Sequence, residues 1–181
     1  MDKDNLFEKI ESIIAKRTVV DYEQIPEIDL YMDQLTKFID DRLGGYKRNK
    51  TDKILTKTMI NNYAKDNLLP PPEKKKYNKE QIALLILIYH LKSSITINDI
   101  SAIFDYMETE KISVENVYRS FEEKLKKEIR EFPDGVKEII DQKEQPERKK
   151  TLILLAIIDL ILEANSRKLL AERLIDTLKS E

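Results

Sequence analysis

The sequence of 181 residues contains no cysteine, no tryptophan, one histidine and three glycines. Without cysteine there is no disulfide framework, no thiol nucleophile and none of the usual structural zinc sites. One histidine excludes a histidine cluster for zinc or iron and a two-histidine relay. The sequence also lacks the glycine-rich patterns that bind nucleotide phosphates. These absences argue against an enzyme, and we expect neither a metal ion nor an organic cofactor.

Long hydrophobic runs are also scarce. The most apolar run, Leu152–Leu162, is interrupted by Asp159 and is too short to cross a bilayer, so we expect it to be a buried core helix. We expect a salt bridge or a helix-interface hydrogen bond for Asp159, with a role in an effector pocket as the alternative. The N-terminus lacks the hydrophobic region of a signal peptide. The sequence therefore predicts a cytoplasmic protein that does not bind a membrane.

The charges nearly cancel overall but are unevenly distributed. The chain has 32 Lys and Arg against 34 Asp and Glu, a formal net charge of −2. The segment Lys47–Lys79 nevertheless carries ten basic and three acidic residues. Such a segment on an otherwise acidic protein indicates a surface for a polyanion, although a solvated face explains it equally well.

Apolar residues recur at helical spacing, and no segment alternates with the period of a β-strand, so the fold class is predicted to be all-α. Gly44 and Gly45 are expected to end the second helix in a left-handed cap. Caps are expected at Thr56 or Thr58, at Asn78, at Thr96 or Asn98, and at Ser113, and a proline at the first position of a helix near the C-terminus. The predicted helices cover about 4–17, 28–43, 56–66, 78–92, 96–104, 113–132, 136–140, 146–162 and 169–178.

The basic segment resembles the DNA-binding domain of the MerR-like winged helix-turn-helix regulators. Thr58–Pro71 lies over the family's helix and Leu-Leu-x-Pro signature, Lys76–Asn78 over the end of its wing, and Ile82–Ile103 over its following helix pair. The resemblance implies a winged helix-turn-helix with a possible tiny β-wing, binding to double-stranded DNA, and a homodimer.

A longer resemblance links the chain to the bacterial family called domain of unknown function eighteen-thirty-six. It rests on Ile25–Gln34, Thr56–Tyr63 and Leu69–Tyr77. This family brings no established activity. The resemblance implies a relationship to helix-turn-helix proteins and a role in transcription regulation.

The candidate DNA-binding residues lie on the predicted helix at 56–66 and in the basic tip that follows. Asparagine suits bidentate contacts with adenine, whereas lysine and threonine suit phosphate or guanine. Ile60 is expected to face the core. Tyr63 is expected either to pack in the core or to contact phosphate. Tyr77 is expected to anchor the basic tip on the helix that follows. The candidates are Thr56, Lys57, Thr58, Asn61, Asn62, Tyr63, Lys65, Lys74, Lys75, Lys76 and Tyr77.

Three regions are predicted: an N-terminal helix over 1–27, the helix-turn-helix region over 28–108, and a C-terminal region over 109–181 that forms a compact bundle of short helices. The C-terminal region is expected to mediate self-association or to pack on the N-terminal helix, with the sensing of an unidentified small-molecule effector as an alternative role. His90, which has no second histidine or cysteine as a partner, is expected to be structural. The alternative function is a helical protein–protein adaptor that does not bind DNA.

Overall fold

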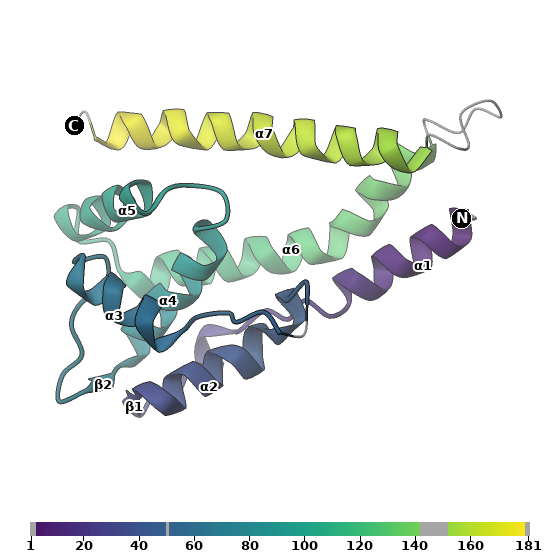
Figure 1. Ribbon diagram of the computed structural model, residues 1–181. Coiled ribbons are helices and arrows are strands. Elements are labelled where there is room, and N and C mark those ends of the chain that lie inside the picture. The colour runs from purple at the N-terminus through teal and green to yellow at the C-terminus, as the bar shows by residue number, and fades with distance from the viewer. Residues whose placement is uncertain (1–2, 50, 142–151, 180–181) are drawn as a thin grey trace.

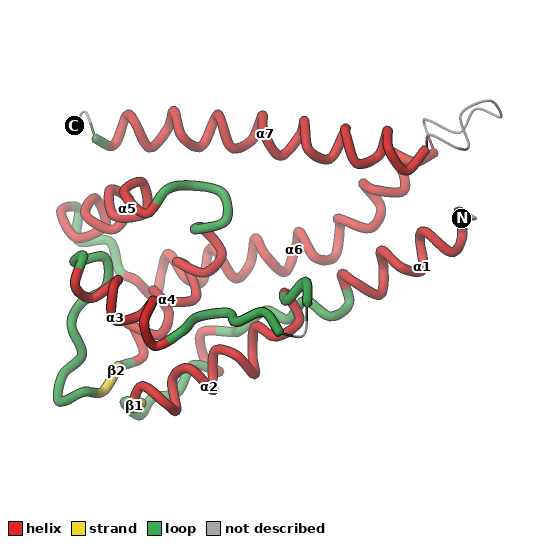
Figure 2. The backbone as a smooth tube through the Cα atoms, viewed as in Figure 1, coloured by secondary structure: helices red, strands yellow, loops and turns green. Residues whose placement is uncertain are grey.

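The computed structural model describes residues 3–49, 51–141 and 152–179. Within these residues the chain is mostly helical, which confirms the all-α prediction (Figures 1 and 2). The helices are α1 (Lys3–Ile14), α2 (Met32–Leu43), α3 (Lys57–Lys65), α4 (Lys79–Leu91), α5 (Ile97–Thr109), α6 (Val114–Asp141) and α7 (Leu152–Leu178), with short 3₁₀ turns η1 (Tyr22–Gln24) and η2 (Gly44–Tyr46). Two short strands, β1 (Leu30–Tyr31) and β2 (Lys76–Tyr77), pair antiparallel.

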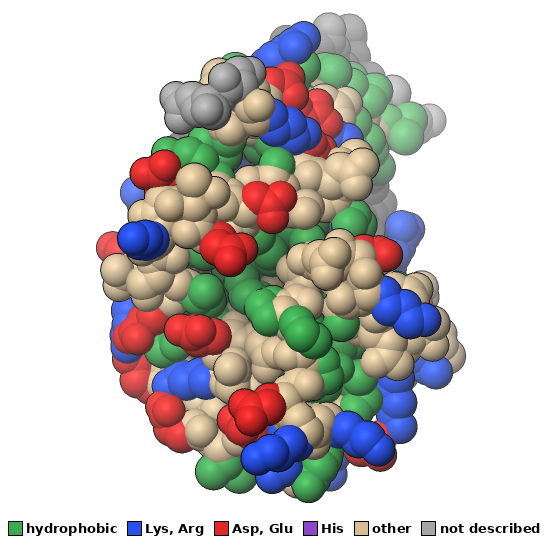
Figure 3. Space-filling view, turned by 90° about the vertical axis from the view of Figure 1, so that its left-hand side faces the viewer, with side chains coloured by type: hydrophobic (Ala, Val, Ile, Leu, Met, Phe, Trp, Pro, Cys, Tyr) green, Lys and Arg blue, Asp and Glu red, His purple; other side chains and the backbone are tan. Residues whose placement is uncertain are grey.

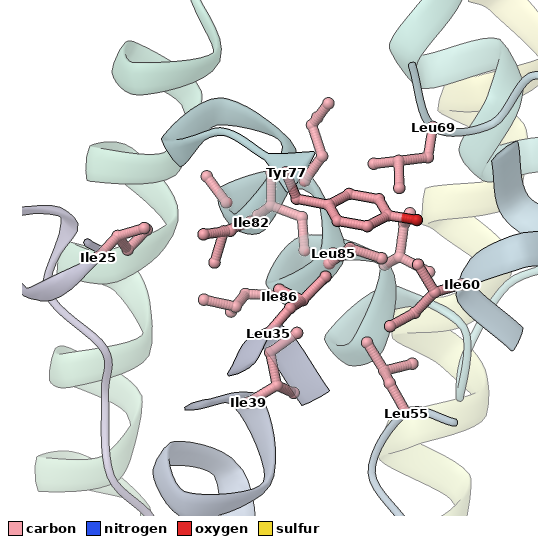
Figure 4. Packing of buried hydrophobic residues seen from close by; sticks show 14 of the residues in the cluster. Ile25, Leu35, Ile39, Leu55, Ile60, Leu69, Tyr77, Ile82, Leu85 and Ile86 are labelled. Atoms are coloured by element: carbon pink, nitrogen blue, oxygen red, sulfur yellow. The ribbon is translucent and has the colours of Figure 1, made fainter. Parts of the chain in front are cut away.

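Helix α4 forms the centre of the main core. All of residues 81–88 are buried, because elements from both directions of the chain pack around this helix. Figure 4 shows Ile82, Leu85 and Ile86 of α4 among side chains of α2, α3 and the β2 segment. The buried cluster runs from Val20 to Tyr118. Residues 20–118 therefore share one core, which we call the central module.

A second, smaller layer lies outside the central module. Ala156 of α7 is buried against Phe7, Ile10, Phe132 and Leu160. Helix α1 packs on α6, and α7 packs on α5 and α6. Figure 1 shows α7 extended along one edge of the molecule above α5 and α6.

The predicted start of the second helix, at residue 28, is wrong. Ile28 is exposed, and Leu30–Tyr31 is a strand that pairs with Lys76–Tyr77. Helix α2 begins only at Met32, where the side chain of Gln34 accepts a hydrogen bond from the Tyr31 amide at 3.0 Å. The strand pairing extends the backbone and delays the helix by one turn.

The left-handed glycine cap is also wrong. Gly44 has a right-handed φ of −57° and begins η2. Gly45 is required for a different reason: a Cβ atom at this position would lie 1.6 Å from the Lys16 carbonyl oxygen. Gly45 therefore lets the turn that follows α1 approach the turn that follows α2.

The predicted compact C-terminal bundle is wrong as well. Pro133 lies inside α6, which continues to Asp141. A proline inside a helix removes one hydrogen bond and kinks the helix without always ending it, and Figure 1 shows α6 changing direction toward α7 in its C-terminal part. The prediction of a helix start at Pro146 falls outside the described residues.

The two last predicted helices are one helix, α7, and its apolar first half is not a core helix. Leu154, Ile157, Ile158, Ile161 and Leu162 are each between 47% and 60% exposed. Asp159 is half-buried. None of the described helices is long and apolar enough to cross a membrane.

Candidate nucleic-acid interface

Helix α3 has one buried and one exposed face. The Thr56 hydroxyl caps the helix by accepting a hydrogen bond from the Met59 amide at 3.1 Å, which decides between the two predicted caps. Ile60 and Tyr63 are buried in the central module. The opposite face presents exposed polar side chains, those of Thr58, Asn61, Asn62 and Lys65.

The chain after α3 is fixed by its backbone. Asn67 has a φ of 56°, a left-handed geometry that asparagine adopts more readily than most residues. This conformation lets the amides of Leu68 and Leu69 both donate to the Tyr63 carbonyl, at 2.9 and 3.1 Å. Leu68 and Leu69 are then buried. The end of α3 is therefore held rigidly against the core.

The proline segment is attached to α4 by one buried side chain. Gln81 donates from Nε2 to the carbonyl oxygens of Pro70 and Pro71, at 2.8 and 3.0 Å. Gln81 also completes the N-terminal capping box of α4 with Asn78, the predicted cap. This contact fixes the position of the basic tip relative to α3.

The basic tip is a two-residue hairpin turn at Lys74 and Lys75, which we call the lysine turn. The Lys76 amide donates to the Glu73 carbonyl at 2.8 Å. Lys74 and Lys75 have φ values of 48° and 65°, a conformation usually left to Asn and Gly because other side chains are strained there. Both side chains are exposed. The turn therefore presents two adjacent cations at a rigid position.

The two tyrosines among the candidates are core residues. Tyr63 is 8% exposed and Tyr77 is 2% exposed, and burial raises the pKa of both hydroxyls. Figure 4 shows the Tyr77 ring reaching between Leu69 and Ile60, which confirms that Tyr77 anchors the tip. Tyr63 and Tyr77 therefore support the exposed candidate residues from the core and are not part of the exposed surface themselves.

Two of the candidate lysines already have partners. Lys57 forms an ion pair with Asp33 of α2. Lys76 is half-buried, with its Nζ 5.0 Å from the centre of the Tyr31 ring. By contrast, within the described part of the chain Lys65, Lys74 and Lys75 form no ion pair. Of the three consecutive lysines in the basic tip, Lys74 and Lys75 are therefore exposed, whereas Lys76 lies against Tyr31 of β1.

Helix α3 and the lysine turn lie at the same end of the molecule (Figure 1). Figure 3 looks onto this end and shows Lys and Arg side chains mainly along the bottom and the right-hand edge, with Asp and Glu mainly on the left. Helix α7 packs on α5 and α6 and leaves the polar face of α3 exposed.

A groove of about 660 Å³ extends this surface along α2. The basic loop after α2 forms one wall and the start of α3 forms the end. Its hydroxyl and ammonium groups can donate to an anion, although Asp40 accepts from Lys47 at 2.7 Å. Thr36 and Lys37 of α2 also line this groove. The sequence analysis did not identify them, because they become part of the groove only where the loop between α2 and α3 packs beside α2. The groove is lined by Thr36, Lys37, Asp40, Lys47, Thr51, Asp52, Lys53, Leu55, Thr56, Lys57 and Thr58.

The loop that walls this groove is anchored to the core. Ile54 and Leu55 are buried, and Lys92 donates to the Ile54 carbonyl at 3.3 Å. Burial lowers the pKa of Lys92. The described residues between η2 and α3 thus form a loop that is held to the core at its C-terminal end.

His90 lies away from this surface in an aromatic cluster. Its ring centre lies 4.9 Å from Tyr46, 5.3 Å from Tyr89 and 5.1 Å from Phe121. Burial, with a smaller contribution from Arg17, lowers the pKa of His90 to about 4. The imidazole is therefore neutral at physiological pH, and its packing agrees with the structural role predicted for it.

A family model described as domain of unknown function (DUF1836) matches residues 20–121. The chain belongs to this family. The matched range nearly coincides with the central module, which leaves α1, most of α6 and all of α7 outside it. No curated protein and no solved structure matches the chain.

Proposed function

We propose that the protein is a DNA-binding transcription regulator that places α3 in the major groove and the lysine turn on the neighbouring phosphate backbone. The observation that carries the proposal is the two-faced α3. Ile60 and Tyr63 fix the helix to the core, while Thr58, Asn61, Asn62 and Lys65 are left exposed, as are Lys74 and Lys75 of the lysine turn.

The side chains suit the two kinds of DNA contact. Asn61 and Asn62 can pair with base edges, because an amide both donates to and accepts from adenine. Lys65 and Thr58 can hold phosphates on either side of the groove. The rigid lysine turn adds two phosphate contacts, and the groove beside α2 offers further donors to the same strand.

The sequence resemblance supports the same assignment. Thr58–Pro71 resembles the recognition-helix signature of MerR-like regulators, and β2 stands where their wing ends. The chain differs in the long connection between α2 and α3, residues 44–56, where those regulators have a tight turn. We propose that this anchored basic loop takes over part of the phosphate contact.

Binding to a random duplex, followed by fluorescence anisotropy over a salt series, tests the electrostatic part of this proposal. With Lys65, Lys74 and Lys75 on phosphates, the slope of log K against log salt should be about −3 per chain. Lys74→Ala with Lys75→Ala should reduce the slope by about 2. Lys124→Ala with Lys127→Ala on exposed α6 removes the same charge and should leave the slope unchanged.

Base readout needs a separate test with a preferred sequence obtained by in vitro selection. Asn61→Ala or Asn62→Ala should cost about 1–3 kcal/mol and relax specificity at one position, whereas the lysine variants weaken binding to all sequences alike. Absence of binding at low salt, or a slope insensitive to the lysine turn, contradicts the proposal.

The second candidate is the protein–protein adaptor, favoured by the exposed apolar side chains of α7. The two functions differ in what the purified protein carries. Bound nucleic acid, detected by the ratio of absorbance at the nucleic-acid and protein maxima, supports the regulator. If the purified protein carries no nucleic acid and does not bind duplex DNA, the adaptor function is supported.

A further inference from the structure

A cleft of about 410 Å³ lies where the C-terminal end of α7 meets the central module. The end of α4 and the turn before α5 form one wall, and α5 itself forms another. The last two turns of α7 form the third side. Figure 1 shows this end of α7 above α5. The cleft therefore depends on the packing of α7 against the central module.

The end of α7 is held in place beside this cleft. Ile175 is buried, and Lys179 just beyond the helix pairs with Asp99 of α5 at 2.7 Å. By contrast, every residue from 161 to 171 is exposed, and a helical segment without packing is only marginally stable in water. A compound bound in the cleft would therefore add to the few contacts that hold α7.

The lining of the cleft is aliphatic and uncharged. Of the ten described residues that line it, seven are aliphatic, three are polar and none is Asp, Glu, Lys or Arg. An ionised group that moved from water into such a lining would lose its hydration without gaining a partner. The cleft therefore favours an uncharged compound. Its larger aliphatic side chains are Leu91, Ile95, Ile103, Leu174, Ile175 and Leu178.

Three polar side chains, those of His90, Ser94 and Thr177, offer hydrogen bonds in the cleft. In the described part of the chain, the imidazole of His90 and the hydroxyl of Ser94 have no hydrogen-bond partner. The neutral imidazole carries one donor and one acceptor. Thr177 donates its hydroxyl to the Leu174 carbonyl at 2.6 Å, and the hydroxyl oxygen can still accept. These groups can orient one polar group of a bound compound.

We propose that this cleft binds a small, uncharged and mostly apolar organic compound that carries a hydroxyl, carbonyl or amide group. Sites for small molecules have volumes of about 300–1,000 Å³, are mainly apolar and contain a few polar groups that fix orientation. They also lie preferentially between helices and at boundaries between structural units. The cleft agrees with each of these features. The inference goes beyond the proposed function and does not depend on DNA binding.

Fluorescence of N-phenylnaphthylamine, an uncharged aromatic amine that emits strongly only in apolar surroundings, tests the proposal on the full chain. We expect saturable binding at one site. Ala171→Phe puts a ring into the cleft and should weaken binding by about tenfold or more. Ala164→Phe is the matched control, because Ala164 is exposed on the same face of α7 two turns earlier and outside the cleft.

The affinity of Ala164→Phe should equal that of the wild type. Unchanged circular dichroism shows that both variants fold, which is expected because both alanines are exposed. A wild type that does not bind the dye overturns the proposal, and so does equal affinity of the two variants.

The uncharged class of the compound is tested by competition. Octanol and octanoate have the same alkyl chain length and differ in charge at neutral pH. Octanol should displace the dye, and octanoate should require a concentration at least about tenfold higher, because its carboxylate finds no partner in the cleft. Failure of octanol to displace the dye, or equal displacement by octanoate, overturns this assignment.

Hydrogen exchange locates the bound dye. Because the dye contacts α5 and α7 together, saturation should slow exchange in residues 171–178 and in α5, and leave residues 161–170 unchanged. Protection confined to 161–170 would place the dye on the exposed side chains of α7 and overturn the proposal. None of these tests contains DNA, so failure of the DNA-binding proposal leaves their readouts unchanged.

Discussion

Helices α4 and α7 are both apolar over most of their surface, yet one is buried and the other is exposed. Residues 81–88 of α4 are all buried in the central module, whereas residues 161–171 of α7 are all exposed. The difference lies in their neighbours. Helix α4 has packing partners before and after it in the chain, and α7 is packed only near its ends. Apolar composition therefore shows that a helix needs a partner, without showing whether that partner is in the same chain.

The largest expected effect compares one leucine from each helix. Leu85→Ala in α4, at a fully buried position, should lower the free energy of unfolding by about 2–5 kcal/mol. Leu170 of α7 is 65% exposed, so Leu170→Ala should change this free energy by no more than about 0.5 kcal/mol. Urea unfolding followed by circular dichroism measures both. Similar losses would show that the middle of α7 is packed.

The next effect concerns His90, at the end of α4. Because burial lowers the pKa of His90 to about 4, the unfolded chain takes up a proton below pH 6.5 that the folded chain does not. Stability should therefore fall as the pH drops from 6.5 to 4, by about 3 kcal/mol relative to His90→Phe. Below pH 4 this difference should no longer grow.

Unfolding of wild type and His90→Phe across this pH range separates His90 from other groups. Hydrogen bonds from Lys179 and Thr96 lower the pKa of Asp99 to about 2, so its contribution is lost only below pH 4 and is common to both proteins. Parallel pH curves for the two proteins between pH 4 and 6.5 would contradict the burial of His90.

A smaller effect is expected where α1 meets the central module. Gly45→Ala would put a Cβ atom onto the Lys16 carbonyl, so the end of α1 must move, at a cost of about 1–3 kcal/mol. Gly44→Ala is the matched control, because no atom lies within 4 Å of its Cβ position. Hydrogen exchange should show faster exchange in α1 for Gly45→Ala alone. Equal exchange in both variants would show that α1 does not depend on this approach.

The sequence predicted the local features of the central module well. The all-α class, the buried Ile60 and the caps at Asn78, Thr96 and Ser113 all follow from short-range chemistry. The candidate surface on α3 was predictable for the same reason, because helical spacing alone separates its buried face from its exposed face.

The errors arose where distant segments decide the outcome. The pairing of Leu30–Tyr31 with Lys76–Tyr77 joins segments that are 46 residues apart, and no local pattern announces it. The exposure of α7 depends on which segments remain to cover it. The pairing of Lys57 with Asp33 depends on how α2 packs beside α3. These contacts cannot be predicted from the residue pattern of a single helix, because each depends on a segment elsewhere in the chain.

The smallest expected effect separates support from contact within α3. Thr56→Ala removes the hydroxyl that caps Met59 and should cost about 1 kcal/mol of stability. Thr58→Ala, two residues later and exposed, should leave stability within about 0.5 kcal/mol. If α3 docks on DNA, Thr58→Ala should weaken binding to a duplex without this loss of stability, because its hydroxyl faces outward. Thermal unfolding and anisotropy on the same samples separate the two roles. Equal stability losses would mean that the cap is not at Thr56, and unchanged binding by Thr58→Ala would remove this hydroxyl from the interface.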